Sequence, residues 1–310
     1  MLEDAESEVA IAVEALRRSK RLGHAAALVL LEDLLLRHPA DSTIEGVLGK
    51  AAVDLGEVSG SLSAARQEHD QGTKVGIRAI PMSSPRYPQS LRDIGDAPLI
   101  LYVRGNLDAL GKAGVAVVGT RKATSHGLQI AERIAEFLSV NGWPIVSGLA
   151  LGIDAAAHEG ALRGKSPTIA VLAHGLLKAS PRANELLAQR ILEAGGAWVS
   201  EHSARVPAKP EHFVLRNRIQ VGLSVGSIIV EGALHSGSAT QAEFCIRNKR
   251  QLFAVLPSGS PNVTIQHELP EMLVRRRGAM PIASREDYPA VLERLNKGVT
   301  ADAVSSSDPR

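Results

Sequence analysis

The chain has 310 residues, of which 45% are hydrophobic and 22% are charged. This is the composition of an ordinary globular protein, and it excludes a largely disordered or fibrous chain. The formal charge of +2 is too small to indicate a nucleic-acid-binding protein by bulk electrostatics. Only the distribution of charge along the chain can indicate whether it binds nucleic acid.

The cysteine and histidine content and the N-terminus narrow the class of protein further. The single cysteine, Cys245, excludes an internal disulfide, and no cysteines and histidines have the spacing of a zinc site. The N-terminus is acidic, and the longest early apolar run, Ala25–Leu31, stops at Glu32 and Asp33. We therefore expect a cytoplasmic protein with no metal site, no export signal and no membrane-spanning segment.

The first 111 residues are predicted to contain a helical domain and a connector. In residues 1–72, apolar side chains such as Val9, Val13 and Leu16 recur near helical spacing, which predicts a small helical domain. Residues 73–111 contain four prolines, which suit an extended connector better than a helix. This connector is expected to end in a strand at Leu99–Val103.

In residues 112–296, short aliphatic runs alternate with amphipathic stretches. Continuous aliphatic runs are typical of buried parallel strands, and their alternation with helices predicts an α/β fold, an extended Rossmann-like, doubly wound and mostly parallel sheet. The predicted strands are Val115–Val118, Pro144–Val146, Thr168–Leu172, Ala197–Ser200, Ser227–Val230 and Leu252–Val255. The predicted helices are Leu128–Asn141, Ala155–Arg163, Ala183–Glu193, Arg216–Leu223 and Ala239–Asn248.

The end of the chain gives weaker patterns. Residues 274–295 have room for one more helix or a strand pair, and residues 297–310 lack periodicity and are predicted to form a disordered tail.

Three predicted strands are followed by loops rich in glycine and hydroxyl side chains. Glycine lets backbone N–H groups approach an anion, hydroxyl groups add donors, and the next helix contributes its N-terminus. Because the carboxyl ends of parallel strands meet at one edge of a sheet, the three loops together predict a phosphate-binding rim. Arg121 is expected to hold a phosphate there, the alternative being a surface ion pair. The loops are Gly119-Thr120-Arg121, Ser147-Gly148-Leu149-Ala150-Leu151-Gly152 and Ser236-Gly237-Ser238.

Positive charge is concentrated in the same part of the chain. Residues 113–257 hold 15 Lys and Arg against 10 Asp and Glu, whereas the remainder holds 20 against 23. Lys209, Arg216 and Arg218 lie near Phe213 in the sequence. Cations around an aromatic ring are what a groove for single-stranded nucleic acid needs, although basic clusters are more often solvated surface.

Few residues suggest catalysis. No nucleophile with an obvious partnered base stands out. Asp154 and His158 share one helix face, but a role for Asp154 as the helix N-cap is favoured over catalysis. Glu231 and Glu243 are a conceivable carboxylate pair near the rim.

From about Ser84 to Tyr288, the chain resembles the bacterial DNA-processing protein A family (DprA, also called Smf). The resemblance rests on motifs that occur in the family's order and spacing. They are Tyr87-Pro88-Gln89-Ser90-Leu91, Leu101-Tyr102-Val103-Arg104-Gly105, Val118-Gly119-Thr120-Arg121, Ser147-Gly148-Leu149-Ala150, Gly152-Ile153-Asp154-Ala155-Ala156-Ala157-His158, Arg216-Asn217-Arg218-Ile219 and Ser236-Gly237-Ser238.

The resemblance implies a protein that binds single-stranded DNA, forms a homodimer and passes the strand to the RecA recombinase during natural transformation. It implies no cofactor and no enzymatic turnover. Carried over by position, Arg121, Lys209, Phe213 and Arg216 would contact DNA, with the three loops holding phosphates. The nucleic-acid site expected from all these considerations comprises Gly119, Thr120, Arg121, Ser147, Gly148, Lys209, Phe213, Arg216, Asn217, Arg218, Ser236, Gly237 and Ser238.

The chain also departs from the family pattern. Ala173-His174-Gly175-Leu176-Leu177 and Ser180-Pro181 replace a Gly-Thr-Gly-Leu-Asp and a Tyr-Pro. Val214 and Leu215 stand where a proline and a basic residue are common, and Gln241 stands near a usual threonine. With only Gly23-His24 where a Gly-x-Gly turn is expected, residues 1–72 would be a degenerate SAM or helix-hairpin-helix-like domain.

Two other functions remain open at this point. Nucleoside-monophosphate phosphoribohydrolases use a Gly-Gly-x-Gly-Thr-x-x-Glu loop on a similar fold, and Thr240 and Glu243 keep the end of that pattern while Ser238 and Ala239 break it. A sensor of a nucleotide-derived signal is the other alternative.

Overall fold

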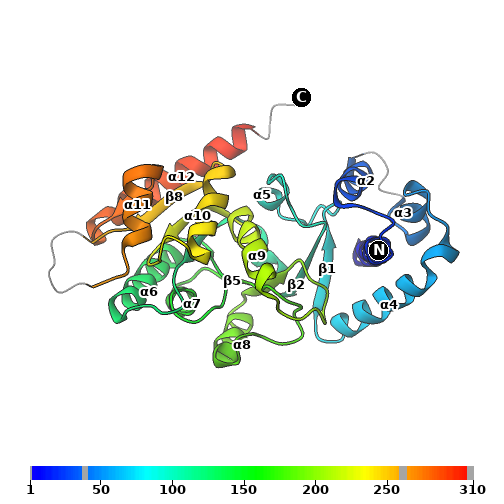
Figure 1. Cartoon of the computed structure of the whole chain (residues 1–310), viewed down its shortest axis with the longest axis horizontal. Coiled ribbons are helices and arrows are strands. Elements are labelled where there is room, and N and C mark those ends of the chain that lie inside the picture. Colours follow the sequence, from blue (N-terminus) through cyan, green and yellow to red (C-terminus); the bar gives the residue numbers. More distant parts are fainter. Residues whose placement is uncertain (1, 37–40, 258–263, 306–310) are drawn as a thin grey trace.

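The computed structural model describes residues 2–36, 41–257 and 264–305 (Figure 1). In these residues nine strands form one sheet, in the order β1-β2-β6-β5-β4-β3-β7-β8-β9. All neighbouring strands from β6 to β9 are parallel, whereas β2 pairs antiparallel with both β1 and β6. The strands are β1 (Ile77–Pro81), β2 (Ile100–Gly105), β3 (Gly114–Val118), β4 (Ile145–Ser147), β5 (Thr168–Val171), β6 (Ala197–Ser200), β7 (Ser224–Ile229), β8 (Gln251–Val255) and β9 (Met280–Ile282).

Helices cover both faces of this sheet. They are α1 (Leu2–Arg18), α2 (His24–Leu36), α3 (Ile44–Lys50), α4 (Leu55–Thr73), α5 (Gln89–Arg92), α6 (Ser125–Val140), α7 (Ile153–Arg163), α8 (Glu185–Glu193), α9 (Pro210–Gly222), α10 (Gly237–Arg247), α11 (Glu268–Arg277) and α12 (Tyr288–Ser305). The predicted mostly parallel, doubly wound α/β sheet is therefore confirmed.

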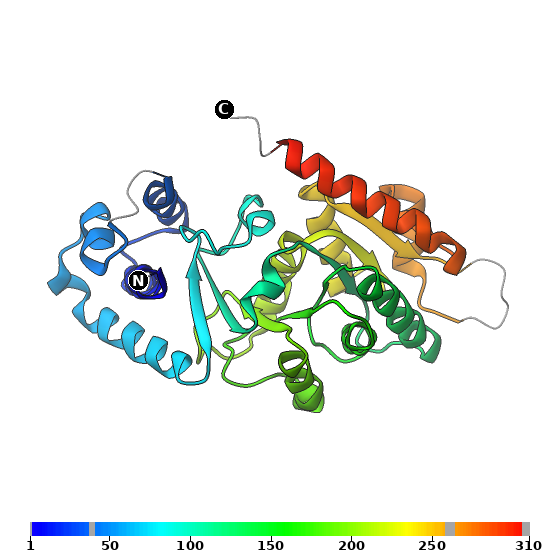
Figure 2. The ribbon, with the colours of Figure 1, turned by 180° about the vertical axis from the view of Figure 1, so that it is seen from behind.

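The alternation of side chains along β3 shows how the two layers form. Val115 and Val117 pack in the cluster that contains residues of α6, α7 and α12, which Figure 2 shows across the rear face. Ala116 and Val118 point to the other face, where α9 and α10 pack. Each strand residue thus buries its side chain against a helix on one face or the other, as period-two alternation requires.

The strand order reverses direction at β3. From β3 the chain winds outward through β4, β5 and β6, and it then returns to pair β7 with the other edge of β3. The loops that leave the carboxyl ends of β3 and β7 therefore diverge to opposite sides. Such a point leaves a crevice at the sheet edge where ligands bind in open α/β proteins.

The N-terminal helices lie at one end of the elongated molecule, beyond β1 (Figure 1). Their core is continuous with the sheet, because Leu16 of α1 and Ala65 of α4 belong to one buried cluster with Ile77 of β1 and Tyr102 of β2. Residues 1–72 thus pack as an extension of the sheet's own core, while their division from the connector at residue 72 stays a prediction.

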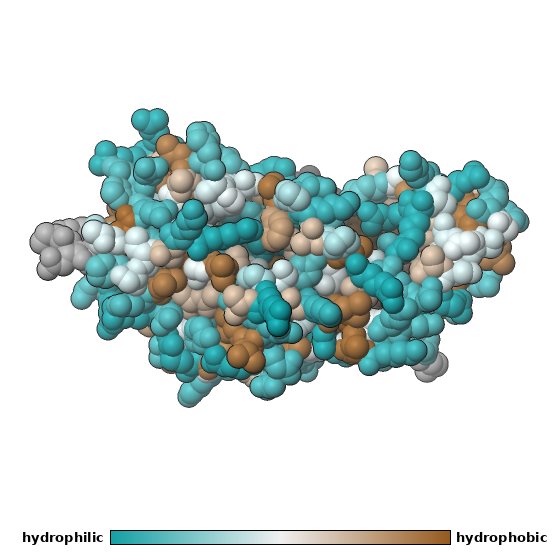
Figure 3. Space-filling view, turned by 60° about the horizontal axis from the view of Figure 1, so that its bottom comes forward, coloured by the Kyte–Doolittle hydropathy of each residue, from teal (hydrophilic) through white to brown (hydrophobic). Residues whose placement is uncertain are grey.

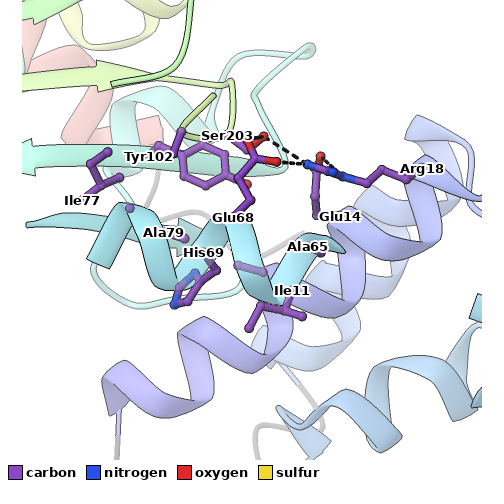
Figure 4. Close-up of a pocket in the computed structure, with 13 residues that line it drawn as sticks. Ile11, Glu14, Arg18, Ala65, Glu68, His69, Ile77, Ala79, Tyr102 and Ser203 are labelled. Atoms are coloured by element: carbon purple, nitrogen blue, oxygen red, sulfur yellow. Dashed lines mark hydrogen bonds and ion pairs between the residues drawn. The ribbon is translucent and has the colours of Figure 1, made fainter. Parts of the chain in front are cut away.

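A polar network reinforces this contact (Figure 4). Arg18 of α1 donates to Glu14 at 3.0 Å and also pairs with Glu68 of α4. Glu68 in turn accepts from the Ser203 hydroxyl at 2.8 Å and from the Arg205 backbone N–H at 2.9 Å. The network joins α1 and α4 to the loop that follows β6.

The end of the chain holds more structure than the sequence indicated. Residues 268–282 form α11 and β9, and α12 continues helically to Ser305, whereas a tail was expected from residue 297. The correction has a physical reason: Ala301 and Ala303 favour a helix, and no proline interrupts the chain between Pro289 and Pro309. The rest of the expected tail, residues 306–310, lies outside the described residues.

A close contact between α6 and α7 in the rear layer leads to a stability prediction. Gly160 of α7 lies against the backbone of Glu132 in α6, where a Cβ would overlap the carbonyl group. We expect Gly160→Ala to lower the free energy of unfolding by about 2 kcal/mol, because a rigid neighbour must move to admit the methyl group. The measurement is urea denaturation followed by circular dichroism.

Gly60→Ala is the matched control, because Gly60 lies within α4 and has no atom near the position of a Cβ. There we expect no loss, and a gain of up to about 1 kcal/mol from helix propensity. Equal stability of the two variants would contradict the packing described for α6 and α7.

Candidate functional site

A groove of about 320 Å³ opens at the carboxyl ends of β3 and β7. It lies at the reversal of the strand order, and α9 forms one of its walls. Its lining residues are Val118, Gly119, Thr120, Arg121, Ala150, Asp154, Phe213, Val214, Arg216, Asn217, Gln220, Ser236, Gly237, Ser238 and Gln241. The structure therefore brings together nine of the thirteen residues expected from the sequence. They are Gly119, Thr120, Arg121, Phe213, Arg216, Asn217, Ser236, Gly237 and Ser238.

Close backbone packing shapes the loop after β3. A Cβ on Gly119 would lie 2.6 Å from Ile153 Cγ1 and 2.8 Å from the Glu231 carbonyl oxygen. Gly152 has a φ of +79°, and a Cβ there would overlap the Thr120 carbonyl group, which accepts from the Ile153 N–H at 3.2 Å. Glycine at these positions lets the loops after β3 and β4 touch.

Arg121 and Phe213 form a stacked pair at the groove. The Arg121 guanidinium carbon lies 4.9 Å from the centroid of the Phe213 ring, although the residues come from the β3 loop and from α9. Arg121 is exposed and Phe213 half-buried. A guanidinium in this position keeps its donors free for a phosphate while the ring offers a surface for a base.

Arg216 is a buried wall of the groove. Its Nη1 donates to the Val171 carbonyl oxygen at 2.6 Å, and its guanidinium occupies the space that a Cβ on Gly148 would take. Burial lowers the pKa of Arg216, and the neighbouring carboxylate of Asp154 acts in the opposite direction. Burial likewise raises the pKa of Asp154, opposed by the charge of Arg216 and by the backbone N–H groups of Gly148 and Ala150.

The start of α10 forms the opposite rim. Ser236 is its N-cap, and the Ser236 hydroxyl oxygen accepts from the Ala239 N–H at 3.3 Å. Asn217 Nδ2 donates to the Gly237 carbonyl oxygen at 2.9 Å, which joins α9 to α10. The N-terminus of α10 therefore faces the groove with its partial positive charge.

Four of the expected site residues lie outside the groove lining, and one of them is Gly148, which is buried against the Arg216 guanidinium. Ser147 is buried and its hydroxyl donates to the Val117 carbonyl oxygen at 2.7 Å, so it is not available to a phosphate. Arg218 is also buried, with its Nη atoms donating to the two oxygens of Glu201 at 2.8 and 2.7 Å and its Nε to the Asp96 carbonyl oxygen. Both are corrections to the sequence prediction. Lys209 is exposed at the N-cap of α9, outside the groove lining.

Asp154 and His158 do not form a catalytic pair. The N-cap of α7 is Gly152, and Asp154 instead accepts from loop N–H groups, which corrects its expected capping role. His158 Nδ1 lies 2.7 Å from the Thr168 hydroxyl, which donates to the Ile145 carbonyl oxygen and therefore accepts from the imidazole. Burial, with the nearby charge of Arg216, lowers the pKa of His158 to about 3.

The two carboxylates considered for acid–base work are both engaged in other contacts. Glu231 is fully buried and accepts from the Thr124 N–H, the Thr124 hydroxyl and the Gln266 N–H, at 3.0, 2.6 and 3.1 Å. Glu243 pairs with Arg277 of α11 at 2.6 Å. Neither side chain lines the groove.

Two groove residues, Gln220 and Gln241, were not among the expected site residues. Gln241 was noted only as a departure from the family pattern. The sequence spacing could have indicated them, because Gln220 follows Arg216 by four residues and Gln241 follows Gly237 by four. Both spacings place the residues on one helix face.

Comparisons with known proteins decide the family. Residues 78–293 match the model of a family described as DNA recombination-mediator protein A. The chain belongs to this family. The match covers the sheet from β1 to β9 together with the whole groove.

Individual relatives agree. The chain is 40% identical over 221 residues to the Smf protein of Escherichia coli, and the match spans 71% of this chain but only 57% of that protein. It is similar to the structure of DprA from Streptococcus pneumoniae, with a TM-score of 0.65, 28% identity and coverage of 93% of this chain and 95% of the other. A DprA structure from Helicobacter pylori, described in terms of its single-stranded DNA binding mode, gives a TM-score of 0.60 at 29% identity over 67% of this chain and 94% of the other.

The described residues lack two further features. Among them, no group of three or more His, Cys, Asp or Glu side chains is arranged to hold a metal ion. None of the helices in this part of the chain combines the length and apolar character needed to cross a membrane.

The buried His158 generates a pH prediction. The pKa of its imidazole is near 6.5 in an unfolded chain and about 3 in the folded protein, so between these values the unfolded state binds more protons. Acid therefore favours unfolding, and His158 alone should lower the free energy of unfolding by about 2 kcal/mol between pH 6.5 and pH 4.5.

The measurement is the free energy of unfolding against pH for the wild type and for His158→Gln. The variant should show a shallower slope over this interval, whatever its absolute stability, since the other buried histidines keep their own contributions. An unchanged slope would mean that His158 is not held neutral by burial.

Proposed function

We propose that this protein binds single-stranded DNA in the groove between β3 and β7 and acts as a recombination mediator without catalysing a reaction. The observation that carries the proposal is the Arg121–Phe213 pair, which stands beside the N-terminus of α10. It combines a phosphate-binding cation with an aromatic face in one groove.

The geometry favours an unpaired strand over a duplex. Phe213 offers a ring face at the groove, and a base can stack on a ring only if its own face is free of neighbouring base pairs. The backbone N–H groups of the α10 N-terminus and the exposed guanidinium of Arg121 supply contacts to the sugar-phosphate chain, which carry no sequence preference. The single-stranded DNA binding mode described for the H. pylori relative supports the same assignment.

The absence of turnover is part of the proposal. Among the described residues that line the groove, Asp154 is the one carboxylate, and its oxygen accepts two backbone N–H bonds beneath the surface. The engagement of Glu243 with Arg277 removes the carboxylate that a phosphoribohydrolase would need in the groove. Binding is thus better supported than hydrolysis.

We further propose a homodimer that hands the strand to the RecA recombinase in the cytoplasm, as the family resemblance implies. Apolar side chains stand exposed beside the groove, with Val214 and Leu215 of α9 at 45% and 46% exposure. On the face seen in Figure 3, hydrophobic residues form several separate groups divided by hydrophilic ones. This mixed character suits a surface that is covered only part of the time.

Reversal of charge at Arg121 tests the binding site. Arg121→Glu removes the guanidinium and places a carboxylate next to the phosphate path, so we expect at least a tenfold rise in Kd for a labelled oligo-dT, which is about 1.4 kcal/mol or more. Fluorescence anisotropy at several salt concentrations measures the change, and wild-type affinity should fall steeply as salt increases.

Arg66→Glu is the control, because Arg66 is exposed on α4 at the far end of the molecule and the substitution changes the net charge equally. It should leave the Kd within about twofold of the wild type. If both variants lose affinity equally, the attraction to DNA is non-specific. If Arg121→Glu binds oligo-dT as tightly as the wild type, the groove is not the binding site.

A nucleotide competitor separates the proposal from the two alternatives. Excess AMP should not displace oligo-dT, since one phosphate supplies only a fraction of the contacts of a strand, and no adenine should be released. Displacement at micromolar AMP would favour a nucleotide sensor, and free adenine would favour a hydrolase.

A further inference from the structure

Glu231, which follows β7, bonds both ends of the loop that carries Arg121. Its backbone carbonyl oxygen accepts from the Thr120 N–H at 2.9 Å. Its carboxylate accepts from the Thr124 N–H at 3.0 Å and from the Thr124 hydroxyl at 2.6 Å. One residue therefore holds the chain just before Arg121 and again three residues after it.

Gln266 holds the same loop from another segment. Its backbone N–H donates to Glu231 Oε1 at 3.1 Å, and its side-chain Nε2 donates to the Lys122 carbonyl oxygen at 2.9 Å. Within the loop, the Lys122 N–H donates to the Thr120 hydroxyl oxygen at 3.2 Å. The backbone on both sides of Arg121 is thus fixed, while Arg121 itself is exposed.

The contacts of the Glu231 side chain require a carboxylate. Glu231 is fully buried, and an N–H group faces each of its two oxygens, that of Thr124 at Oε2 and that of Gln266 at Oε1. A glutamine amide has one oxygen and one NH₂ group, and the NH₂ group cannot accept a hydrogen bond. In either orientation, an amide at this position would set its NH₂ group against an N–H and leave that donor unsatisfied.

We propose that Glu231 is a positioning residue of the groove, which keeps residues 120–124 in the shape that places the Arg121 guanidinium beside Phe213. This inference rests on the proposed single-strand binding and names the residue on which the exposed cation of the groove depends. A loop that is already ordered loses less conformational entropy when a ligand binds, so its contacts contribute more to affinity.

Glu231→Gln tests the proposal, because net charge and positioning predict opposite results. Removal of a carboxylate increases the attraction to DNA, so electrostatics alone would tighten binding. A loosened loop weakens binding, and we expect about a fivefold rise in Kd for labelled oligo-dT, the effect of one unsatisfied N–H group. Fluorescence anisotropy measures the Kd.

Glu243→Gln is the matched control. It removes the same charge from an exposed side chain of α10 whose partner is Arg277 of α11, away from the Arg121 loop. We expect a Kd within about twofold of the wild type, because an exposed ion pair contributes little.

A double-mutant cycle with Arg121→Ala separates positioning from a general effect on the fold. Without the guanidinium there is nothing for the loop to aim, so Glu231→Gln should then change the Kd by less than about twofold. The loss of free energy of unfolding that Glu231→Gln causes, measured by urea denaturation, should be the same in both backgrounds. A purely structural role would instead weaken binding equally in both.

Gln266→Ala tests the same loop if Glu231→Gln does not fold. Gln266 is exposed, and the substitution removes its side-chain bond to the Lys122 carbonyl oxygen while its backbone N–H remains. We expect about a threefold rise in Kd, the effect of one lost hydrogen bond, and no further rise when Arg121 is already alanine.

Unchanged or tighter binding by Glu231→Gln, or an equal loss in the Arg121→Ala background, overturns this inference and leaves single-strand binding intact. If Glu231→Gln does not fold, an unchanged Kd in Gln266→Ala overturns it. Failure of the wild type to bind oligo-dT overturns the proposed function and this inference together.

Discussion

The groove depends on one steric constraint, the absence of side chains at Gly119, Gly148 and Gly152. Gly152 lets the loop after β4 pack on the backbone of the loop after β3, Gly119 makes room for Ile153 and the Glu231 carbonyl group, and Gly148 leaves the space that the Arg216 guanidinium fills. A Cβ on Gly148 would overlap the Arg216 guanidinium, so that side chain and the part of α9 that carries it would have to move. The side chains that line the groove are thus positioned by glycines, which have no side chain of their own.

The fold was predictable because buried parallel strands are continuous aliphatic runs. Ala197–Ser200 was located to the residue, and the other predicted strands of the parallel sheet overlap the observed ones. The short β1 and β9 escaped prediction because Pro81 and Pro281 interrupt any strand pattern in segments of only five and three residues. Helix starts were placed late wherever small or polar residues open the first turn, as at Ser125 of α6 and Gly237 of α10.

Site residues on a loop, such as Gly119 to Arg121, could be predicted from their place after a strand. Site residues on a helix could not, because the sequence alone does not give the direction of their side chains. Arg216 and Arg218 are two residues apart on α9, so one points under the groove and the other turns away to Glu201. From the sequence, both arginines were expected to belong to the nucleic-acid site. Gln220 shows the reverse case, a residue without chemical prominence that the helix turn brings beside Arg216.

The network of Arg18, Glu68 and Ser203 joins the N-terminal helices to the segment that precedes α9. Ser203 belongs to the segment between β6 and α9, and Glu201 in the same segment holds Arg218 of α9. Residues 201–209 therefore bond to α1 and α4 through Ser203 and to α9 through Glu201. Figure 4 shows the contacts of Ser203. A substitution that breaks the Glu68 contacts would therefore loosen residues 201–209, the same segment from which Glu201 holds Arg218 of α9.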